Sequence, residues 1–561
     1  MHKYCTFNFF KLILIKLVFI LPLLISCSGS ASDDGETGPA DPVDIIPANL
    51  SLTIDIRGTD SNHPNGDGFG VVKFSANATN AVSYSFRFGT GDSKTSSGNA
   101  EYTYTEVGTK TYDIKVLAYS STNNYITIDK KITVYVKPDS EQGLLELLAG
   151  NSSKTWKINA AQDAHFSNGS PDKTYSTYWE AAAFSKVNAG FYDDEYIFNV
   201  DGTYKHKTNE DVFGKASYLT NDFGSTSQSP NSSGEIEKYP LDDYQTTFVA
   251  KKDGDENKLE INGKGFVGFY VGQHIYTIEC YDSDNIYLRT QDEGENVAWY
   301  VWLTAKTVSE THPKDQFTNL VWSDEFSDPG ALDSSKWVHE VGDSWYNNEV
   351  QSYTSRLDNS KVEDGKLKII AKKESYNGNN YTSARIISNT KMDFTYGRVD
   401  IKAKIPGTKG TWPALWLLGS NFKTVTWPKC GEIDVLEAAQ SNNFRVQSTV
   451  HHPDNYGEGD SHITNEYTDI TEKFHIYSLV WTKQALTFYV DDKPHHIVGN
   501  SCALPFNWNQ FIILNVAMGG TMGGEISPDF VSDTMEIEYV RVYPVSYTHL
   551  RAHETKANRG C

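Results

Sequence analysis

The stretch Trp427–Glu437, WPKCGEIDVLE, sets three carboxylic acids, Glu432, Asp434 and Glu437, within a short apolar run. Isoleucine, valine and leucine are interleaved with the acids, which predicts a β-strand. Side chains two residues apart share one face of a strand, so Glu432 and Asp434 point the same way and Glu437 is out of phase. One extra residue in a β-bulge would restore the phase and bring all three acids to one surface.

The spacing of the acids predicts chemistry as well as structure. Three carboxylates on one face repel one another, so a stable strand does not collect them without a use. At a rise of ~3.3 Å per residue the backbones of Glu432 and Glu437 stand about 13 Å apart, and inward-leaning side chains would bring the carboxyl groups to roughly 5–6 Å. That gap is expected of a retaining glycosidase, with Asp434 keeping the protonation states of the pair apart. A solvated acidic edge strand is the alternative.

The stretches around this strand carry a resemblance to a known family. EIDVLE is similar to the catalytic strand of glycoside hydrolase family 16 in its bulged form, which is typical of laminarinase-type endo-β-1,3-glucanases. Further stretches resemble that family in the same order: LVWSDEF (320–326), YNNEVQSYT (346–354), YTSARI (381–386), YGRVDIKAKIP (396–406), GTWPALWLLG (410–419), FHIYSLVW (474–481), ILNVAMGG (513–520) and EYVRVY (538–543). The resemblance implies a catalytic domain over residues 317–544, folded as a two-sheet β-jelly roll with a groove on its concave sheet.

The same resemblance implies roles for individual residues. Glu432 would be the nucleophile and Glu437 the general acid/base, while Asp434 would steer their protonation. Hydrolysis would need no cofactor and would act on a laminarin-like β-1,3-glucan with retention of configuration. The substrate-binding residues carried over are the cleft aromatics Trp412, Trp416 and Trp427, Arg385 beside the nucleophile, Asn347 and Glu349 near the non-reducing subsites, and His451 near the acid/base. Core packing is the alternative for Trp416, and a surface salt bridge is the alternative for Arg385.

A structural calcium on the convex face is the one metal that the resemblance implies. The family usually supplies an aspartate just before YVRVY, where this sequence has Glu538, a longer side chain. The carbonyls of Glu325 and Gly365 would be its companions, and the role of the ion would be stability.

Length, net charge and cysteine count predict the number of domains, the kind of partner and the state of the thiols. A chain of 561 residues is too long for one core, which predicts about three domains. The net charge of −22 argues against nucleic acid as a partner, and a monomer is expected. Apart from the leader, Cys27 and the C-terminal tail, the cysteines are Cys280, Cys430 and Cys502. This odd number predicts free thiols and no disulfide framework.

The first residues predict export and anchoring. Residues 1–26 combine lysines with a short apolar run, Leu17–Ile25, which is typical of a secretory signal peptide. The run ends in LISC, Leu24–Cys27, which resembles a bacterial lipobox and makes Cys27 the lipidation site. The small and acidic residues that follow resemble the signal for the outer face of the outer membrane, while the periplasm-facing leaflet and secretion stay open. Residues 27–47 are expected to form a lipidated, flexible tether.

Two all-β modules are predicted before the catalytic domain. Residues 48–138 resemble a PKD-type, immunoglobulin-like β-sandwich, for which a spacer role is expected and sugar binding is the lesser alternative. Residues 139–311 form a second all-β module, which resembles lipocalin-like barrels in its strand order and in Trp156 near its start. The sequence leaves open whether its aromatics build a carbohydrate platform or a core; they are Trp179, Tyr192, Trp299, Tyr300 and Trp302.

The fold class is therefore all-β throughout. Residues 545–561 resemble one reading frame of a sequencing adapter and are excluded from the fold. Mixed-linkage glucan and a marine galactan are the alternative substrates. A non-catalytic glycan-binding surface lipoprotein is the alternative from another class, and the intact acid triad disfavours it.

Overall fold

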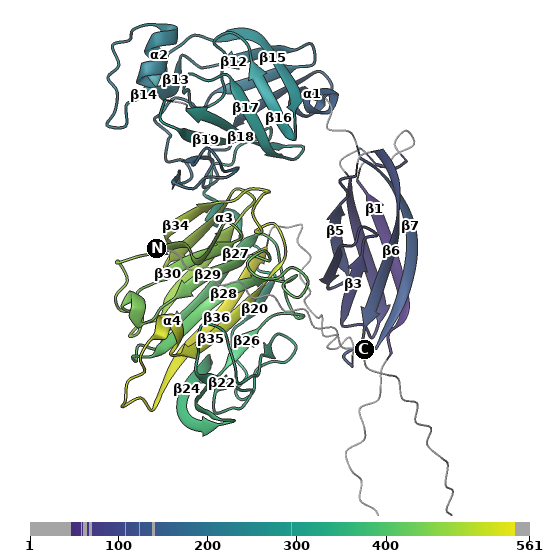
Figure 1. The fold of residues 1–561 in the computed structure, drawn as a ribbon, viewed down its shortest axis with the longest axis vertical. Coiled ribbons are helices and arrows are strands. Elements are labelled where there is room, and N and C mark those ends of the chain that lie inside the picture. Colours follow the sequence, from purple (N-terminus) through teal and green to yellow (C-terminus); the bar gives the residue numbers. More distant parts are fainter. Residues whose placement is uncertain are drawn as a thin grey trace, which may run out of the picture. The chain divides into compact units, whose positions relative to one another are not determined.

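The computed structural model describes residues 46–57, 59, 64–66, 70–106, 108–122, 124–136, 141–292 and 294–544, and these are mostly β-strand (Figure 1). The predicted signal peptide, the lipidation site Cys27 and the adapter-like tail lie outside the described residues. Within that part of the chain, no helix is long and apolar enough to cross a membrane.

The first module is a sandwich of two small antiparallel sheets. The strands are β1 (Ala48–Ile56), β2 (Val71–Thr79) and β5 (Asn99–Thr103) in one sheet, and β3 (Ser83–Arg87), β4 (Ser93–Ser96), β6 (Gly108–Tyr119) and β7 (Tyr125–Val136) in the other. Alternate residues of both sheets, among them Phe74, Phe86 and Val134, meet in one core. The predicted β-sandwich is present, and its likeness to a PKD module stays a prediction.

The second module is barrel-like. A ten-stranded sheet closes because its terminal strand β8 also pairs with β19. The elements are α1 (Glu141–Ala149), β8 (Ser153–Ile158), β9 (Phe166–Gly169), β10 (Trp179–Glu180), β11 (Glu195–Asn199), β12 (Thr203–Lys207), β13 (Asp211–Lys215), α2 (Ala216–Phe223), β14 (Glu235–Pro240), β15 (Tyr244–Asp253), β16 (Glu256–Ile261), β17 (Ile275–Tyr281), β18 (Asn285–Asp292) and β19 (Val297–Thr304). Closure removes sheet edges and leaves an interior that side chains fill.

The aromatic residues of this barrel are mostly core. Trp299, Tyr300 and Trp302 on β19 are buried, which rules out a carbohydrate platform made of these three. Tyr192 is half-buried, and its hydroxyl lies 2.6 Å from Nε2 of His165. Of the five aromatics considered for the platform, Trp179 alone is exposed.

The C-terminal domain follows the short helix α3 (Pro313–Gln316) and consists of two packed sheets. The acid-bearing sheet, which contains Glu432, Asp434 and Glu437, has the order β21-β26-β35-β28-β29-β30-β31, and the outer sheet has the order β22-β25-β24-β36-β27-β32-β33-β34 with β20 and β23 attached. The acid-bearing sheet comprises β21 (Val338–His339), β26 (Arg385–Ile387), β35 (Gln510–Met518), β28 (Thr411–Gly419), β29 (Glu432–Glu437), β30 (Gln447–His452) and β31 (Asn455–Ile463). The outer sheet comprises β20 (Trp322–Asp324), β22 (Gln351–Tyr353), β23 (Ser360–Glu363), β24 (Lys366–Tyr376), β25 (Asn379–Ser383), β27 (Gly397–Lys404), β32 (His475–Trp481), β33 (Ala485–Val490), β34 (Lys493–Gly499) and β36 (Ser532–Pro544).

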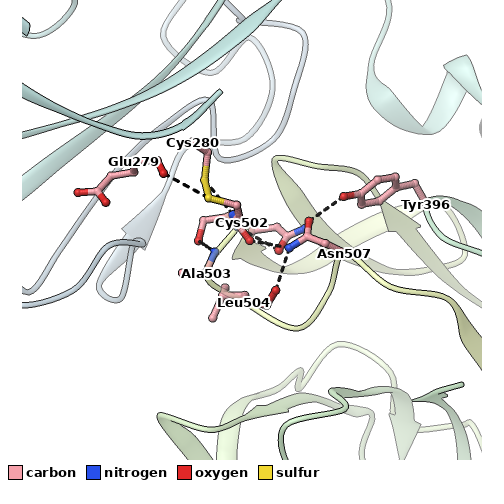
Figure 2. Close-up of a disulfide and its surroundings, with 9 residues drawn as sticks. Glu279, Cys280, Tyr396, Cys502, Ala503, Leu504 and Asn507 are labelled. Atoms are coloured by element: carbon pink, nitrogen blue, oxygen red, sulfur yellow. Dashed lines mark hydrogen bonds between the residues drawn. A yellow bond between two sulfur atoms is a disulfide. The ribbon is translucent and has the colours of Figure 1, made fainter. Parts of the chain in front are cut away.

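The prediction of free thiols is wrong for two of the three cysteines. Cys280 of β17 and Cys502, in the loop after β34, form a disulfide across 222 residues of sequence. Figure 2 shows this bond beside a loop held by Asn507, whose side chain donates to the carbonyls of Ser501 and Leu504. Cys430 stays free and buried. The odd number of cysteines did not exclude a disulfide, because Cys430 packs in the interior while the other two lie on different modules that contact each other.

Further contacts join the barrel to the C-terminal domain. Thr487 of β33 donates a buried hydrogen bond of 2.7 Å to the carboxylate of Asp163. Tyr175 packs into the core of the C-terminal domain, and its hydroxyl donates to Asp454 at 3.0 Å. Because Asp454 sits in the turn between β30 and β31, the barrel supports a hairpin that borders the three acids.

Candidate active site

The strand β29 carries all three acids and is bulged. Against β28, Trp416 lies opposite Asp434 and Leu415 opposite Leu436, so Val435 is the extra residue. The register with β30 shifts at the same place. The predicted bulge is therefore present, and it returns Glu437 to the face that Glu432 and Asp434 occupy.

The acids sit in a largely dry environment. Asp434 and Glu437 are buried, and the side chain of Glu432 keeps 19% of its surface exposed. Nε1 of Trp412 donates a 3.1 Å hydrogen bond to the Glu437 carboxylate. The Oδ2 atom of Asp434 is buried and accepts no hydrogen bond from the described residues, although Nε2 of His451 lies 3.3 Å from it.

Burial governs the protonation of this cluster. It raises the pKa of Glu437, against smaller opposing effects from His451 and from the Trp412 hydrogen bond. Burial, followed by the charge on Asp434, raises the pKa of Glu432 to about 8. The pKa of Asp434 is held well above its usual range by burial and by the charge on Glu437. The three groups therefore do not all ionise together near neutral pH.

The two glutamates differ in exposure and not in the direction of their pKa shift. Glu432 is the more exposed of the two, and His451 and Arg385 oppose the burial that raises its pKa. His451 and the Trp412 hydrogen bond oppose the burial that raises the pKa of the enclosed Glu437. A carboxyl group next to solvent and an enclosed one can divide the roles of nucleophile and acid.

His451 lies beside the nucleophile position. Its Nε2 is 3.3 Å from Asp434 and 3.8 Å from Glu432, because His451 pairs with Glu432 in the ladder between β29 and β30. In the ladder, Glu437 pairs with Gln447 at the other end of β30. His451 nevertheless also lowers the pKa of Glu437, so its predicted place near the acid/base stays a prediction.

A chain of hydrogen bonds runs from the floor of the site to Glu349. Nε1 of Trp416 donates to Asn515 at 2.7 Å, and the Asn515 amide donates to the Tyr353 hydroxyl at 3.1 Å. The carboxylate of Glu349 accepts from Tyr353 at 3.2 Å and from Gln351 at 2.7 Å. The sequence analysis missed Asn515, Tyr353 and Gln351; the one available signal was an asparagine inside the apolar strand ILNVAM.

Arg385 forms the salt bridge that was the alternative for it, and its contact with the sugar stays a prediction. Its Nε donates to Glu340 at 2.6 Å, so the salt bridge exists. Its guanidinium also lies over the ring of Trp416, 4.7 Å from the centroid, and 5.3 Å from that of Trp345. Trp416 is therefore half-buried beneath the Arg385 guanidinium and is not a fully buried core residue.

Two exposed aromatics border the nucleophile side. Trp427 is 45% exposed, and its ring lies 5.9 Å from that of His451 and 5.8 Å from that of Tyr456. Tyr456 is 59% exposed and was not predicted. Asn347 is exposed as well, and its backbone carbonyl accepts from the amide of Thr521 at 3.0 Å.

The residues expected to bind calcium do not fit that ion with Glu538 as a side-chain ligand. Glu538 is ion-paired to Lys402 at 2.7 Å, and the carboxylate of Glu325 accepts two hydrogen bonds from Arg541. Gly365 lies in the turn between β23 and β24. Among the described residues, the one set of acids and histidines with ligand atoms within 4.8 Å of one another is Glu432, Asp434 and His451. That set could hold a cation, but it belongs to the acid cluster itself.

Comparison with known proteins identifies the family of the C-terminal domain. The family model described as "Glycosyl hydrolases family 16" matches residues 347–541. A β-glucanase of Rhodothermus marinus is 36% identical over 42% of this chain and 88% of its own length. A glucan endo-1,3-β-glucosidase A1 of Niallia circulans is also 36% identical, and this chain spans 39% of its length.

Among solved structures, LamA from Zobellia galactanivorans in complex with laminaritriose and laminaritetraose is 40% identical, with a TM-score of 0.38. The match covers 40% of this chain and 99% of that one. The β-glucanase of Rhodothermus marinus is matched over 88% of its length, and the bulged acid strand lies inside the residues that the family model matches. The chain therefore belongs to glycosyl hydrolase family 16.

Proposed function

We propose that the chain is a retaining endo-hydrolase of β-1,3-glucan, with a laminarin-like polysaccharide as substrate. The single observation that carries the proposal is the bulge in β29, which places Glu437 on the same face as Glu432 and Asp434. The relatives named as a β-glucanase and as a glucan endo-1,3-β-glucosidase support this class of substrate. Hydrolysis by two carboxyl groups needs no cofactor.

The two glutamates divide the chemistry. Glu432 attacks the anomeric carbon while Glu437 gives its proton to the leaving oxygen, and a glycosyl ester forms on Glu432. Glu437, now a carboxylate, removes a proton from water, and the water releases the sugar with its original configuration. Asp434 shares protons with the pair and forms no bond to the sugar.

The aromatic residues bind the chain of sugars. Flat rings stack on the apolar faces of pyranoses, and Trp416, Trp427 and Tyr456 offer such rings on the side of the three acids. No cluster of lysines and arginines surrounds the sequence motifs, which disfavours sulfated galactans as substrates. The bulged strand favours β-1,3-glucan over mixed-linkage glucan.

Product analysis tests the proposal. The purified chain is incubated with laminarin, mixed-linkage β-glucan and agarose, and the products are separated by chromatography. Early release of several oligosaccharide sizes from laminarin is expected, with slower or no release from the others. Hydrolysis of agarose alone would show that the substrate is a galactan and not a β-1,3-glucan. No hydrolysis of any of the three polysaccharides would support the non-catalytic glycan-binding alternative.

Stereochemistry tests the roles of the acids separately. Proton NMR of the first products should show the β-anomer before mutarotation, because two displacements at one carbon restore its configuration. Initial formation of the α-anomer would contradict a glycosyl ester on Glu432.

Replacing Trp412 with phenylalanine is expected to move the basic limb of the kcat/KM pH profile to higher pH. The indole N–H stabilises the charged form of Glu437 and so lowers its pKa. Loss of this hydrogen bond therefore raises the pKa of Glu437. The acid then stays protonated to higher pH. The exposed Trp508→Phe is the matched control, and a basic limb that stays in place would contradict the assignment of Glu437 as the acid.

Replacing Arg385 with lysine is expected to raise KM about tenfold and to change kcat little. Lysine keeps the charge but cannot lie flat between Trp416 and Trp345 while donating to Glu340. Arg385 is thus a positioning residue for the floor of the site. A fall in kcat with KM unchanged would instead assign it a role in the transition state.

The proposal also covers the N-terminal residues, which would anchor the enzyme to a membrane. Lipidation of Cys27 would hold the chain at the bacterial cell surface or outer membrane, with residues 27–47 as the tether. Metabolic labelling with a radioactive fatty acid should label the wild-type chain and fail to label Cys27→Ala. Equal labelling of both proteins would contradict lipidation at Cys27.

A further inference from the structure

We propose that two residues of the barrel, Lys173 and Tyr175, are positioning residues for sugar binding by the C-terminal domain. They hold the turn between β30 and β31, and through that turn they hold the ring of Tyr456 beside that of Trp427. The inference rests on the proposed function, in which Trp427 and Tyr456 form a sugar-binding pair. The barrel then takes part in substrate binding without touching the sugar.

The segment that joins β9 to β10, residues 170–178, is fixed to the strands of the barrel. The hydroxyl of Tyr300, a buried residue of β19, donates to the carbonyl of Lys173 at 2.8 Å. The guanidinium of Arg289 on β18 donates to the carbonyl of Pro171 at 3.3 Å. Because side chains of a closed barrel hold its backbone, this segment presents its own side chains to the C-terminal domain from a rigid support.

The two positioning residues meet the same carboxylate. The hydroxyl of Tyr175 donates to Oδ2 of Asp454 at 3.0 Å, and Nζ of Lys173 lies 3.3 Å from the same oxygen. The ring of Tyr175 is buried in the core of the C-terminal domain and stands edge-on to that of His452, with centroids 5.5 Å apart. The hydrogen bond from Tyr175 lowers the pKa of Asp454 and so favours its anion. Because the Asp454 side chain is 50% exposed, these contacts contribute little to the free energy of unfolding.

The turn that carries Asp454 is short and lies at the edge of its sheet. His452 pairs with Asn455 at the end of the ladder between β30 and β31, which leaves Pro453 and Asp454 as the two residues of the turn. Tyr456 follows Asn455 directly. Among the described strands, β31 pairs with β30 alone. The barrel therefore supplies the contact that fixes the start of this edge strand.

Tyr456 depends on this fixed start, whereas the acids do not. The ring of Tyr456 is 59% exposed and lies 5.8 Å from that of Trp427, so its place is set mainly by its backbone. In contrast, His451 pairs with Glu432 in the ladder between β29 and β30, which holds β30 at the acids without the barrel. Loss of the contacts at Asp454 is therefore expected to loosen the sugar-binding pair and to leave the acids in place.

Kinetics of the full chain on laminarin test the inference. Tyr175→Phe keeps the buried ring and loses the hydroxyl, and Asp454→Ala loses the acceptor; each should raise KM about fivefold and change kcat less than about twofold. The double variant should have the KM of Asp454→Ala alone, because both substitutions break the same hydrogen bond. Thr487→Val is the matched control, since it removes a buried hydrogen bond to Asp163 at the same boundary but on another strand. Its KM should equal that of the wild type.

A second background shows whether Tyr175 acts through Tyr456. Tyr456→Ala should itself raise KM, and adding Tyr175→Phe to it should have no further effect, whereas a general loss of structure would raise KM in both backgrounds. A wild-type KM in Tyr175→Phe, an equal rise in the Tyr456→Ala background, or an equal rise in Thr487→Val would overturn the inference.

Failure of the proposed function would give a different result, because the wild type itself would then not hydrolyse laminarin. The same variants are in that case compared by their KM on the polysaccharide that the wild type does hydrolyse, or by their Kd for laminarin if it hydrolyses none. The expected order of the variants is the same in each measurement.

Discussion

Glu432→Gln should lower kcat on laminarin by at least ~10⁴-fold, which corresponds to more than about 5 kcal/mol of transition-state stabilisation. Glutamine has nearly the shape of glutamate but is a poor nucleophile, so the glycosyl ester cannot form. The residual rate should come from binding and from the proton of Glu437. Initial rates of reducing-sugar release measure the loss.

The same variant should not be less stable than the wild type. Glu432 belongs to a buried cluster in which the acids raise one another's pKa, so removing one carboxyl group relieves repulsion. An unchanged or higher Tm, with laminari-oligosaccharide binding retained in calorimetry, separates lost chemistry from lost folding. Glu472→Gln, at an exposed position, is the matched control. Retention of more than about 1% of kcat would exclude Glu432 as the nucleophile.

Removing the disulfide should cause the largest change in stability. The bond between Cys280 and Cys502 closes a loop of 222 residues, for which the loss of chain entropy in the unfolded state predicts about 5 kcal/mol. The double variant Cys280→Ser/Cys502→Ser should therefore melt on the order of 10 °C lower by calorimetry. Since neither cysteine contacts the three acids, kcat on laminarin should be preserved at low temperature.

Reduction supplies the control for this prediction. Dithiothreitol should lower the Tm of the wild type to that of the double variant, and it should leave the double variant unchanged. Cys430 is already free and buried, so its presence in both proteins does not affect the comparison. A wild-type Tm that does not change with the reductant, together with two more reactive thiols in the unfolded, unreduced wild type than in the double variant, would show that the bond does not form.

The disulfide lies at the boundary between the barrel and the C-terminal domain. Thr487 and Asp163, and Tyr175 and Asp454, meet across the same boundary. The barrel thus braces the hairpin of β30 and β31 that carries His451 and Tyr456. From the sequence, residues 139–311 were predicted as a separate all-β module, either carbohydrate-binding or structural, because the partners on the two sides are hundreds of residues apart.

What the sequence determined by itself was local. The pleat alternates side chains with a period of two, so the odd spacing of Glu437 from Asp434 was enough to predict the bulge, and the apolar alternation was enough to predict an all-β chain. The three acids were proposed as catalytic on that basis and on the resemblance of the flanking stretches.

Tertiary structure alone decided which distant residues meet. It buried Trp299, Tyr300 and Trp302, set His451 beside Glu432, joined Asn515 to Trp416, and paired Cys280 with Cys502. Strand order, register between strands and domain packing follow from the burial of many side chains at once, and no single stretch of sequence carries that information.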